Sequence, residues 1–235
     1  MRQYLIFGDH GSDEFGIYIS GAGTFNSPER DVETVTVPGR NGSLTIDNGR
    51  YENTEVSYEA YIRQDFRISA GAARDWLLAS AGYRRLEDTY HPEFYRMARF
   101  SGPLDFDMRF LNMSGECTLT FDCLPQRFDK AGEVLVEMSA AGTLVNPYRQ
   151  TAKPLIRVYG TAAGNLSVGD LIVQIKAVDG YVDLDCETQN AYKGATNCNG
   201  DIYAPEFPTL PAGATGISWD GGITRVEITP RWWTV

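Results

Sequence analysis

Apolar and polar residues alternate along most of this chain. In the segment "ECTLTFDC", residues 116–123, every second residue is apolar, which is typical of a strand with one buried face. The predicted inward residues of this strand are Cys117, Leu119, Phe121 and Cys123. Similar short segments, bounded by Gly, Pro, Asn or Asp, recur along the rest of the sequence. The pattern therefore predicts a mainly β protein built from short strands.

One segment departs from this alternation and predicts a helix. The apolar side chains of "SAGAARDWLLASAG", residues 69–82, recur at helical spacing, at Ala73, Trp76, Leu77 and Ala81. Ser69 fits an N-cap and Gly82 lies just past the predicted end. We expect a single helix over about residues 70–81, with Trp76 as the anchor that packs it on a sheet.

A composition change near the middle of the chain predicts two domains. Residues 140–154, "AAGTLVNPYRQTAKP", contain small residues and two prolines, which favour a connection between domains. We predict an N-terminal domain of β-sheets plus the helix over residues 1–146. The strands after it, without a helix among them, predict an antiparallel β-sandwich over residues 147–235.

Charge and composition exclude several classes of protein. The 235 residues carry a formal net charge of −10 and contain no basic run, which argues against nucleic acid as a direct ligand. No stretch of about eighteen apolar residues occurs, and the N-terminal segment turns polar early, so we expect a soluble chain made in the host cytoplasm. With four cysteines and no secretory signal, we expect no required disulfide, although Cys186 and Cys198 could approach each other across a hairpin.

The segment "DLDCETQNAYKGATNCNGD", residues 183–201, carries the densest group of carboxylates and cysteines. Alternation puts Val182, Leu184 and Cys186 on one face of a strand and Asp183, Asp185 and Glu187 on the other. We therefore interpret the carboxylates as a solvated strand face. Carboxylates two residues apart lie roughly 6.6 to 7 Å from each other, as in an inverting glycosidase, but neighbours on one open face do not straddle a substrate.

Metal binding by this segment is also disfavoured. Zinc would need two ligands besides Cys186 and Cys198, and the histidines, His10 and His91, fall in the other predicted domain. The spacing does not match an EF-hand loop either. We expect no catalytic, metal-binding or cofactor-binding residues in this chain, and no cofactor.

Near the C-terminus, "TRVEITPRWW" places two adjacent tryptophans on opposite faces. Trp232 shares the parity of Val226 and Ile228, so we expect it in the core. Trp233 should be more exposed and is a candidate interface residue; folding of its ring over the sandwich edge is the alternative.

Several segments in collinear order resemble one family, the distal tail protein of siphophages, which is a hub component of the phage tail tip or baseplate. They are "VPGRNGSLTIDNGRYEN" (37–53), "DWLLASAGYRRLEDTYHPEFYRMARF" (75–100), "CTLTFDCLPQRF" (117–128), "NPYRQTAKPLIRVYG" (146–160), "VDLDCETQNAYKG" (182–194) and "FPTLPAGATGISWDGGITRVEITPRWW" (207–233). The likeness covers nearly the whole chain.

The resemblance implies a structural virion protein at the distal end of the tail rather than an enzyme. It implies an N-terminal domain that forms a hexameric ring, a channel that DNA passes, and a C-terminal galectin-like β-sandwich. The implied partners are the tail tube protein, the tape-measure protein and a tail-associated fibre or lysin, without specific nucleic-acid binding or membrane insertion. The length matches a short form without a carbohydrate-binding insertion.

We expect the ring contact in the segment that opens the first matching block. Its candidate residues are Val37, Pro38, Gly39, Arg40, Asn41 and Gly42. Gly39, Gly42 and Gly49 permit close backbone approach, and Arg40 offers a bidentate partner for a neighbour's carboxylate. An ordinary surface hairpin around Asn41-Gly42 explains the same residues.

Two other functions remain open at this point. A carbohydrate-binding β-sandwich involved in recognition of the host cell wall is the first, although a fold alone does not transmit a function. A hydrolase that uses Asp183 and Asp185 is the second.

Overall fold

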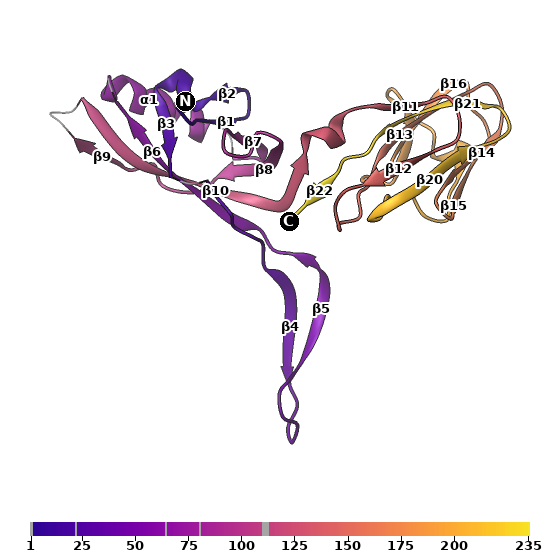
Figure 1. Ribbon diagram of the computed structural model, residues 1–235, viewed down its shortest axis with the longest axis horizontal. Helices are drawn as coiled ribbons and strands as arrows, with labels where there is room; N and C mark the ends of the chain where they lie inside the picture. Colours follow the sequence, from indigo (N-terminus) through magenta and orange to yellow (C-terminus); the bar gives the residue numbers. More distant parts are fainter. Residues whose placement is uncertain (1, 22, 64, 80, 110–112) are drawn as a thin grey trace. The chain divides into compact units, whose positions relative to one another are not determined.

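The computed structural model describes residues 2–21, 23–63, 65–79, 81–109 and 113–235. Two compact units divide the chain, the first comprising Met1–Arg127 with Val235 and the second Phe128–Thr234. Figure 1 shows that strands dominate both units. Within the described residues, α1 (Phe66–Leu78) is the one α-helix, accompanied by the 3-10 helices η1 (Ser12–Phe15), η2 (Lys130–Glu133) and η3 (Asn199–Asp201).

The first unit is built on one antiparallel sheet, which we call the main sheet. Its strands are β1 (Leu5–Phe7), β2 (His10–Gly11), β3 (Ile17–Ser20), β6 (Thr54–Ile62), β7 (Arg84–Asp88), β8 (Phe94–Phe100), β9 (Phe106–Arg109) and β10 (Ser114–Asp129). Their order is β2-β1-β7-β8-β10-β6-β3, and β9 pairs with β10. The strands β4 (Arg30–Thr36) and β5 (Ser43–Tyr51) pair only with each other and form a separate two-stranded ribbon (Figure 1).

The helix begins three residues before the predicted N-cap. Ser69 donates its backbone N–H to the carbonyl of Asp65 at 3.0 Å, so Ser69 already belongs to the first turn. Asp65 is the N-cap residue in a left-handed conformation (φ 52°), and its side chain makes no capping hydrogen bond. The extra turn forms because the Phe66 ring is buried. Of the predicted range 70–81, the helix includes the part up to Leu78, and Ser80 lies outside the described residues.

The predicted role of Trp76 is confirmed. Its ring is buried in the core of the first unit and stacks on Phe15 with 4.8 Å between ring centroids. The indole Nε1–H donates to the carbonyl of Phe7 at 3.2 Å, so the polar end of the ring is satisfied. Phe7 in turn packs on Phe121 of β10, at 5.1 Å between centroids. The packed rings of Trp76, Phe7 and Phe121 therefore attach the helix to the main sheet.

The predicted alternation along β10 is confirmed as well. Cys117, Leu119, Phe121 and Cys123 are all buried. The residues between them point to the opposite face of the main sheet, where Glu116 and Thr118 are exposed. One face of this sheet thus carries the core and the other is polar.

The second unit is a sandwich of two antiparallel sheets. The first sheet contains β11 (Val136–Met138), β21 (Ile223–Thr229), β13 (Leu155–Gly160), β16 (Gly180–Asp185), β17 (Asn190–Lys193) and β18 (Thr196–Asn197), in that order. The second contains β12 (Gly142–Asn146), β20 (Gly213–Trp219), β14 (Gly164–Val168), β15 (Leu171–Ile175) and β19 (Ile202–Tyr203), in that order. The last strand of the chain is β22 (Trp233–Thr234).

A single core fills the space between these two sheets, with side chains such as Ile156 and Leu184 from one sheet and Leu166 and Ile217 from the other. The predicted class is confirmed: the protein is mainly β, with a helix-bearing N-terminal sheet followed by an antiparallel sandwich.

The division between the units lies earlier than the expected boundary at residue 146. Strand β11 pairs with β21, and β12 pairs with β20, so both belong to the sandwich. Within the supposed connection, Asn146 is buried and its side chain donates to the carbonyls of Gln150 and Leu210. Small residues and prolines there reflect a strand end and a tight turn rather than a linker.

Among the described residues, α1 is too short to span a membrane, and no other helix is long and apolar enough to do so.

The two adjacent tryptophans give a test of the predicted parity. Trp232 is 7% exposed in the sandwich core, whereas Trp233 is half-buried and its Nε1–H donates to the carbonyl of Thr151 at 3.0 Å. We expect Trp232→Ala to lower the free energy of unfolding by about 3 to 5 kcal/mol and Trp233→Ala by about 1 to 2 kcal/mol. Denaturant titration of both variants measures the difference, and equal losses would contradict the assignment.

Candidate functional site

The predicted contact segment lies at the tip of the β4–β5 ribbon. Residues 37–42 connect the two strands, and all of them are exposed. The turn is wider than a two-residue Asn41-Gly42 turn, since the backbone N–H of Arg40 donates to the carbonyl of Val37 at 3.2 Å. Arg40 itself has no side-chain partner among the described residues, so its guanidinium is available to another molecule.

The glycines of this ribbon are explained by its backbone. Gly39, Gly42 and Gly49 have φ values of 80°, 79° and 74°, in the left-handed region that favours glycine. Gly49 lies where the pairing register shifts between Arg30 and Val32, which marks a bulge. Apart from the residues adjacent in sequence, nothing in the described part of the chain lies within 4 Å of the position that a Cβ would take at these three glycines.

The ribbon also carries an apolar stripe that the sequence analysis missed. Val35 lies opposite Leu44 and Glu33 opposite Ile46, so these four side chains share one face. Val35, Leu44 and Ile46, which we call the apolar stripe, are 37%, 43% and 44% exposed. The alternation of apolar and polar residues in "VETVTV" (32–37) and "SLTI" (43–46) indicates this stripe. The prediction of a contact rested instead on the glycine-rich turn between the two segments.

Ion pairs stiffen the base of the ribbon. Arg30 pairs with Asp47 at 2.8 Å, and Arg50 pairs with Asp31 at 2.6 Å. The backbone N–H of Gly49 and the Arg30 guanidinium lower the pKa of Asp47 below its ordinary value. These pairs cross the two strands, so they hold the strands together while leaving the apolar stripe uncovered.

The polar face of the main sheet is a second exposed surface. Along β6 and β10, Glu55 lies opposite Asp122, Ser57 opposite Thr120, Glu59 opposite Thr118 and Tyr61 opposite Glu116. We call these eight residues the acidic face. Two arginines beside it are neutralised, because Arg99 pairs with Asp122 at 2.7 Å and Arg109 with Glu116 at 3.2 Å. Glu55 and Glu59 form no ion pair among the described residues, so carboxylates predominate on this surface.

The structure corrects the interpretation of Asp183 and Asp185 as solvated. Asp183 is 3% exposed and receives Arg157 in two hydrogen bonds, of 2.6 and 2.9 Å. Asp185 receives Arg231 at 2.7 and 3.3 Å. Alternation assigned the correct strand face, since Val182, Leu184 and Cys186 are buried in the core. It could not show that arginines from β13 and the C-terminal segment cover the carboxylates.

This arrangement weakens the catalytic and metal hypotheses for that segment. Both carboxylates are engaged by arginines, so neither is free to act as an acid or a nucleophile. No group of three or more His, Cys, Asp or Glu side chains in the described part of the chain is placed to hold a metal ion. Cys186 and Cys198 are free thiols, and burial raises the pKa of Cys186 to about 12.

Trp233, the remaining candidate, is only partly available to a partner. Its ring packs at the margin of the sandwich core and its N–H is already bonded to Thr151. The alternative that it folds over the sandwich edge accounts for this position.

Comparison with solved structures supplies the fold relationship. A crystal structure of the SPP1 Dit (gp 19.1) protein, described as "a Paradigm of Hub Adsorption Apparatus in Gram-positive Infecting Phages", matches with a TM-score of 0.74 at 12% identity, over 100% of both chains. The chain has the Dit fold. The resemblance predicted from collinear segments is confirmed at this level, and the Dit fold extends through both units of the chain.

Two further matches are weaker. Structures of the phage P2 baseplate in its activated conformation, with Ca and with Sr, give TM-scores of 0.49 and 0.46 at 9% and 10% identity, each over 97% of this chain. These chains are covered to 97% and 98% of their own length. No family model and no curated protein matches the sequence.

The pair of Asp185 and Arg231 predicts a specific dependence on pH. Burial raises the pKa of Asp185, but Arg231 and the backbone N–H groups of Glu187 and Thr188 outweigh burial, so the pKa lies below its ordinary value. A lowered folded-state pKa contributes stability above the unfolded-state pKa, and that stability is lost as the pH falls through the folded-state pKa. Asp185→Asn should therefore lower the free energy of unfolding by about 2 kcal/mol at pH 7.

The difference between wild type and Asp185→Asn should shrink as the pH falls below about 4. Denaturant titrations across this range measure it, with Glu187→Gln at an exposed neighbouring position as the matched control. A difference that stays constant with pH would contradict the assignment.

Proposed function

We propose that the chain is the structural hub of a phage tail tip, a distal tail protein that forms a hexameric ring between the tail tube and the host-adsorption apparatus. The observation that carries this proposal is the likeness over both full chains to SPP1 Dit, which is named a hub of an adsorption apparatus. The role is structural and needs no catalytic residue. It places the protein in the virion, at the distal end of the tail.

The β4–β5 ribbon supports ring closure. A ring requires a heterologous contact, in which one surface of each subunit meets a different surface of the next. The ribbon offers such a surface, because its apolar stripe is exposed and the Arg40 side chain has no partner among the described residues. The neighbouring subunit covers the stripe, and one of its carboxylates receives Arg40.

The acidic face of the main sheet is suited to the channel. DNA that passes through a bore is retained wherever unpaired Lys or Arg side chains meet phosphates. The acidic face offers carboxylates and hydroxyls instead, and Arg99 and Arg109 beside it are already paired. Six copies of this face around the axis give a negative lining that repels DNA and lets it slide.

The partners follow from this position in the tail. The ring binds the tail tube protein on one side, and the tape-measure protein and a tail-associated fibre or lysin complete the tip. The chain binds neither a specific nucleic-acid sequence nor a membrane.

Removal of the apolar stripe tests ring closure. The triple variant Val35→Thr, Leu44→Thr and Ile46→Thr keeps β-forming residues but removes apolar surface, so we expect assembly to weaken by about tenfold or more. Light scattering with negative-stain microscopy should show rings for wild type and single chains of 26.1 kDa for the variant.

Val32→Thr is the matched control, since Val32 lies opposite Asp47 on the other face of the ribbon. It should leave the rings intact. Rings of unchanged stability in the triple variant, or a wild-type chain that stays monomeric at high concentration, would count against closure by the ribbon.

Charge reversal on the acidic face tests the channel. Wild-type rings should not retain double-stranded DNA at physiological salt, whereas rings of Glu55→Lys with Glu59→Lys should retain it in a salt-sensitive manner. Gel-shift titrations at two salt concentrations measure the effect. The same reversal at exposed Glu93 and Glu206 serves as the control. Equal DNA retention by both double variants would contradict the assignment of the acidic face to the channel.

A further inference from the structure

Arg96 occupies an unusual position on β8. It shares its strand face with Ala98 and Phe100, and Ala98 is fully buried in the core of the first unit. Arg96 itself is 6% exposed. A guanidinium withdrawn from water in this way is costly unless an anion or several acceptors compensate it.

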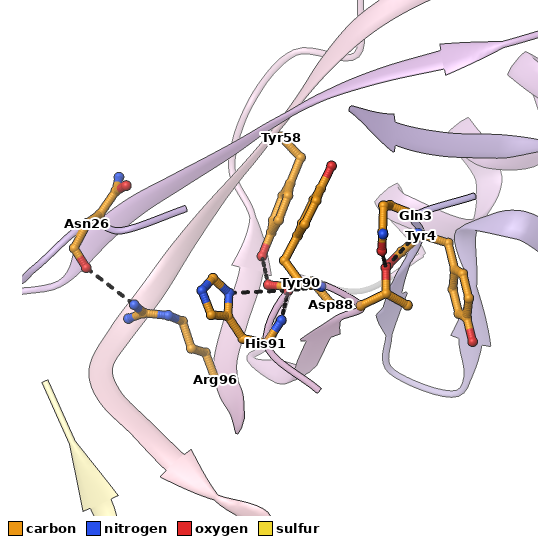
Figure 2. A network of polar contacts seen from close by, with 9 residues as sticks. Gln3, Tyr4, Asn26, Tyr58, Asp88, Tyr90, His91 and Arg96 are labelled. Atoms are coloured by element: carbon orange, nitrogen blue, oxygen red, sulfur yellow. Dashed lines mark hydrogen bonds and ion pairs between the residues drawn. The ribbon is translucent and has the colours of Figure 1, made fainter. Parts of the chain in front are cut away.

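The compensation that the chain provides is small. Nη2 of Arg96 donates to the carbonyl of Asn26 over a long 3.4 Å, and Nη1 has no partner among the described residues. Figure 2 shows Arg96 directed toward Asn26, beside the contacts around Asp88. No carboxylate in the described part of the chain forms an ion pair with Arg96.

Asp88 is the acidic residue beside Arg96, but its oxygens are already engaged. Its carboxylate accepts hydrogen bonds from the Tyr58 hydroxyl at 2.8 Å and from the backbone N–H groups of Tyr90 and His91 at 2.9 and 2.8 Å. Nδ1 of His91 lies 3.4 Å from the same carboxylate. The Asp88 carboxylate therefore stabilises the turn that follows β7 and forms no ion pair with Arg96.

Burial lowers the pKa of Arg96, and this effect outweighs all others. The nearby charge of Arg127 lowers the pKa further, whereas Cys123, Tyr58 and Asp88 act in the opposite direction. An added negative charge next to Arg96 would relieve both effects.

A small cavity adjoins Arg96. The residues that line it include Thr24, Asp88, His91, Arg96 and Arg127, and its volume is about 10 Å³. That space fits one water molecule or one ion of similar size. A phosphate or a larger carboxylate does not fit.

The cavity also adjoins the connector that carries the β4–β5 ribbon. Thr24 and Asn26 lie between β3 and β4, and the Phe25 ring meets His91 edge-on at 5.3 Å between centroids. The side chain of Asn26 donates to the carbonyl of Glu55 at 2.6 Å. A ligand bound to Arg96 therefore also fixes residues 23–29, the connector from which the ribbon extends.

We propose that this cavity binds a small monovalent anion of halide size, held by the unpaired Nη1 group of Arg96, and that the anion fastens residues 23–29 to the main sheet. The site acts within one subunit, so it does not depend on the proposed ring. Its occupant is selected by size and charge.

Chloride is the probe for a thermal test on the full chain. Sodium gluconate is replaced stepwise by sodium chloride at constant ionic strength, and the melting temperature is recorded. Chloride at about ten times its Kd should raise the melting temperature by about 3 °C, and the rise should saturate. General exclusion of a strongly hydrated anion from the protein surface acts in the opposite direction, in favour of gluconate.

Arg96→Met should abolish the chloride effect, while Arg67→Met, which removes an exposed arginine of α1, should preserve it. Equal melting temperatures of wild type in the two salts would overturn the proposal and leave water as the occupant. A chloride effect that survives in Arg96→Met would also overturn it.

Crystals of the wild-type chain grown in bromide provide a second readout that needs no variant. An anomalous peak within hydrogen-bonding distance of Nη1 of Arg96 supports the site. A peak-free cavity next to an otherwise ordered Arg96 contradicts it.

Discussion

The apolar stripe of the β4–β5 ribbon stays exposed among the described residues, and the proposed assembly depends on this exposure. Two paired strands alone are marginally stable in water, yet Val35, Leu44 and Ile46 stand exposed on one face of this pair. Cross-strand ion pairs at its base stabilise the pairing but do not remove apolar surface from water. We propose that another molecule covers this surface, and that this molecule is a neighbouring copy in the proposed ring.

The main sheet of the first unit serves two purposes through its two faces. Its inner face binds α1 through Trp76 and the aromatic contacts of Phe7 and Phe121. Its outer face carries carboxylates and hydroxyls and needs no cover. A strand such as β10 can satisfy both demands because successive side chains point to opposite sides. In the proposed ring, the core of the first unit and the channel lining would thus lie on opposite faces of a single sheet.

The sequence predicted those features that depend on local periodicity. The inward residues of β10, the burial of Trp76 and Trp232, and the core face at Val182 and Leu184 all follow from alternation or helical spacing. The fold was predicted from the collinear resemblance and agrees with the match to SPP1 Dit.

What the sequence did not predict depends on contacts between distant residues. The helix starts at Phe66 because its ring is buried. The sandwich begins before residue 146 because β11 and β12 find partners in β21 and β20. Arginines cover Asp183 and Asp185 from other strands and the C-terminal segment.

Hydrogen exchange of the ribbon amides, followed by mass spectrometry as a function of protein concentration, tests the central claim most directly. If a second copy covers the ribbon, peptides from residues 30–51 should exchange quickly in dilute protein and become protected as rings form. Peptides from β10 should stay protected throughout, because they lie in the core of the main sheet. Ribbon amides with the same protection in single chains and in rings would contradict the claim that the neighbouring subunit completes this surface.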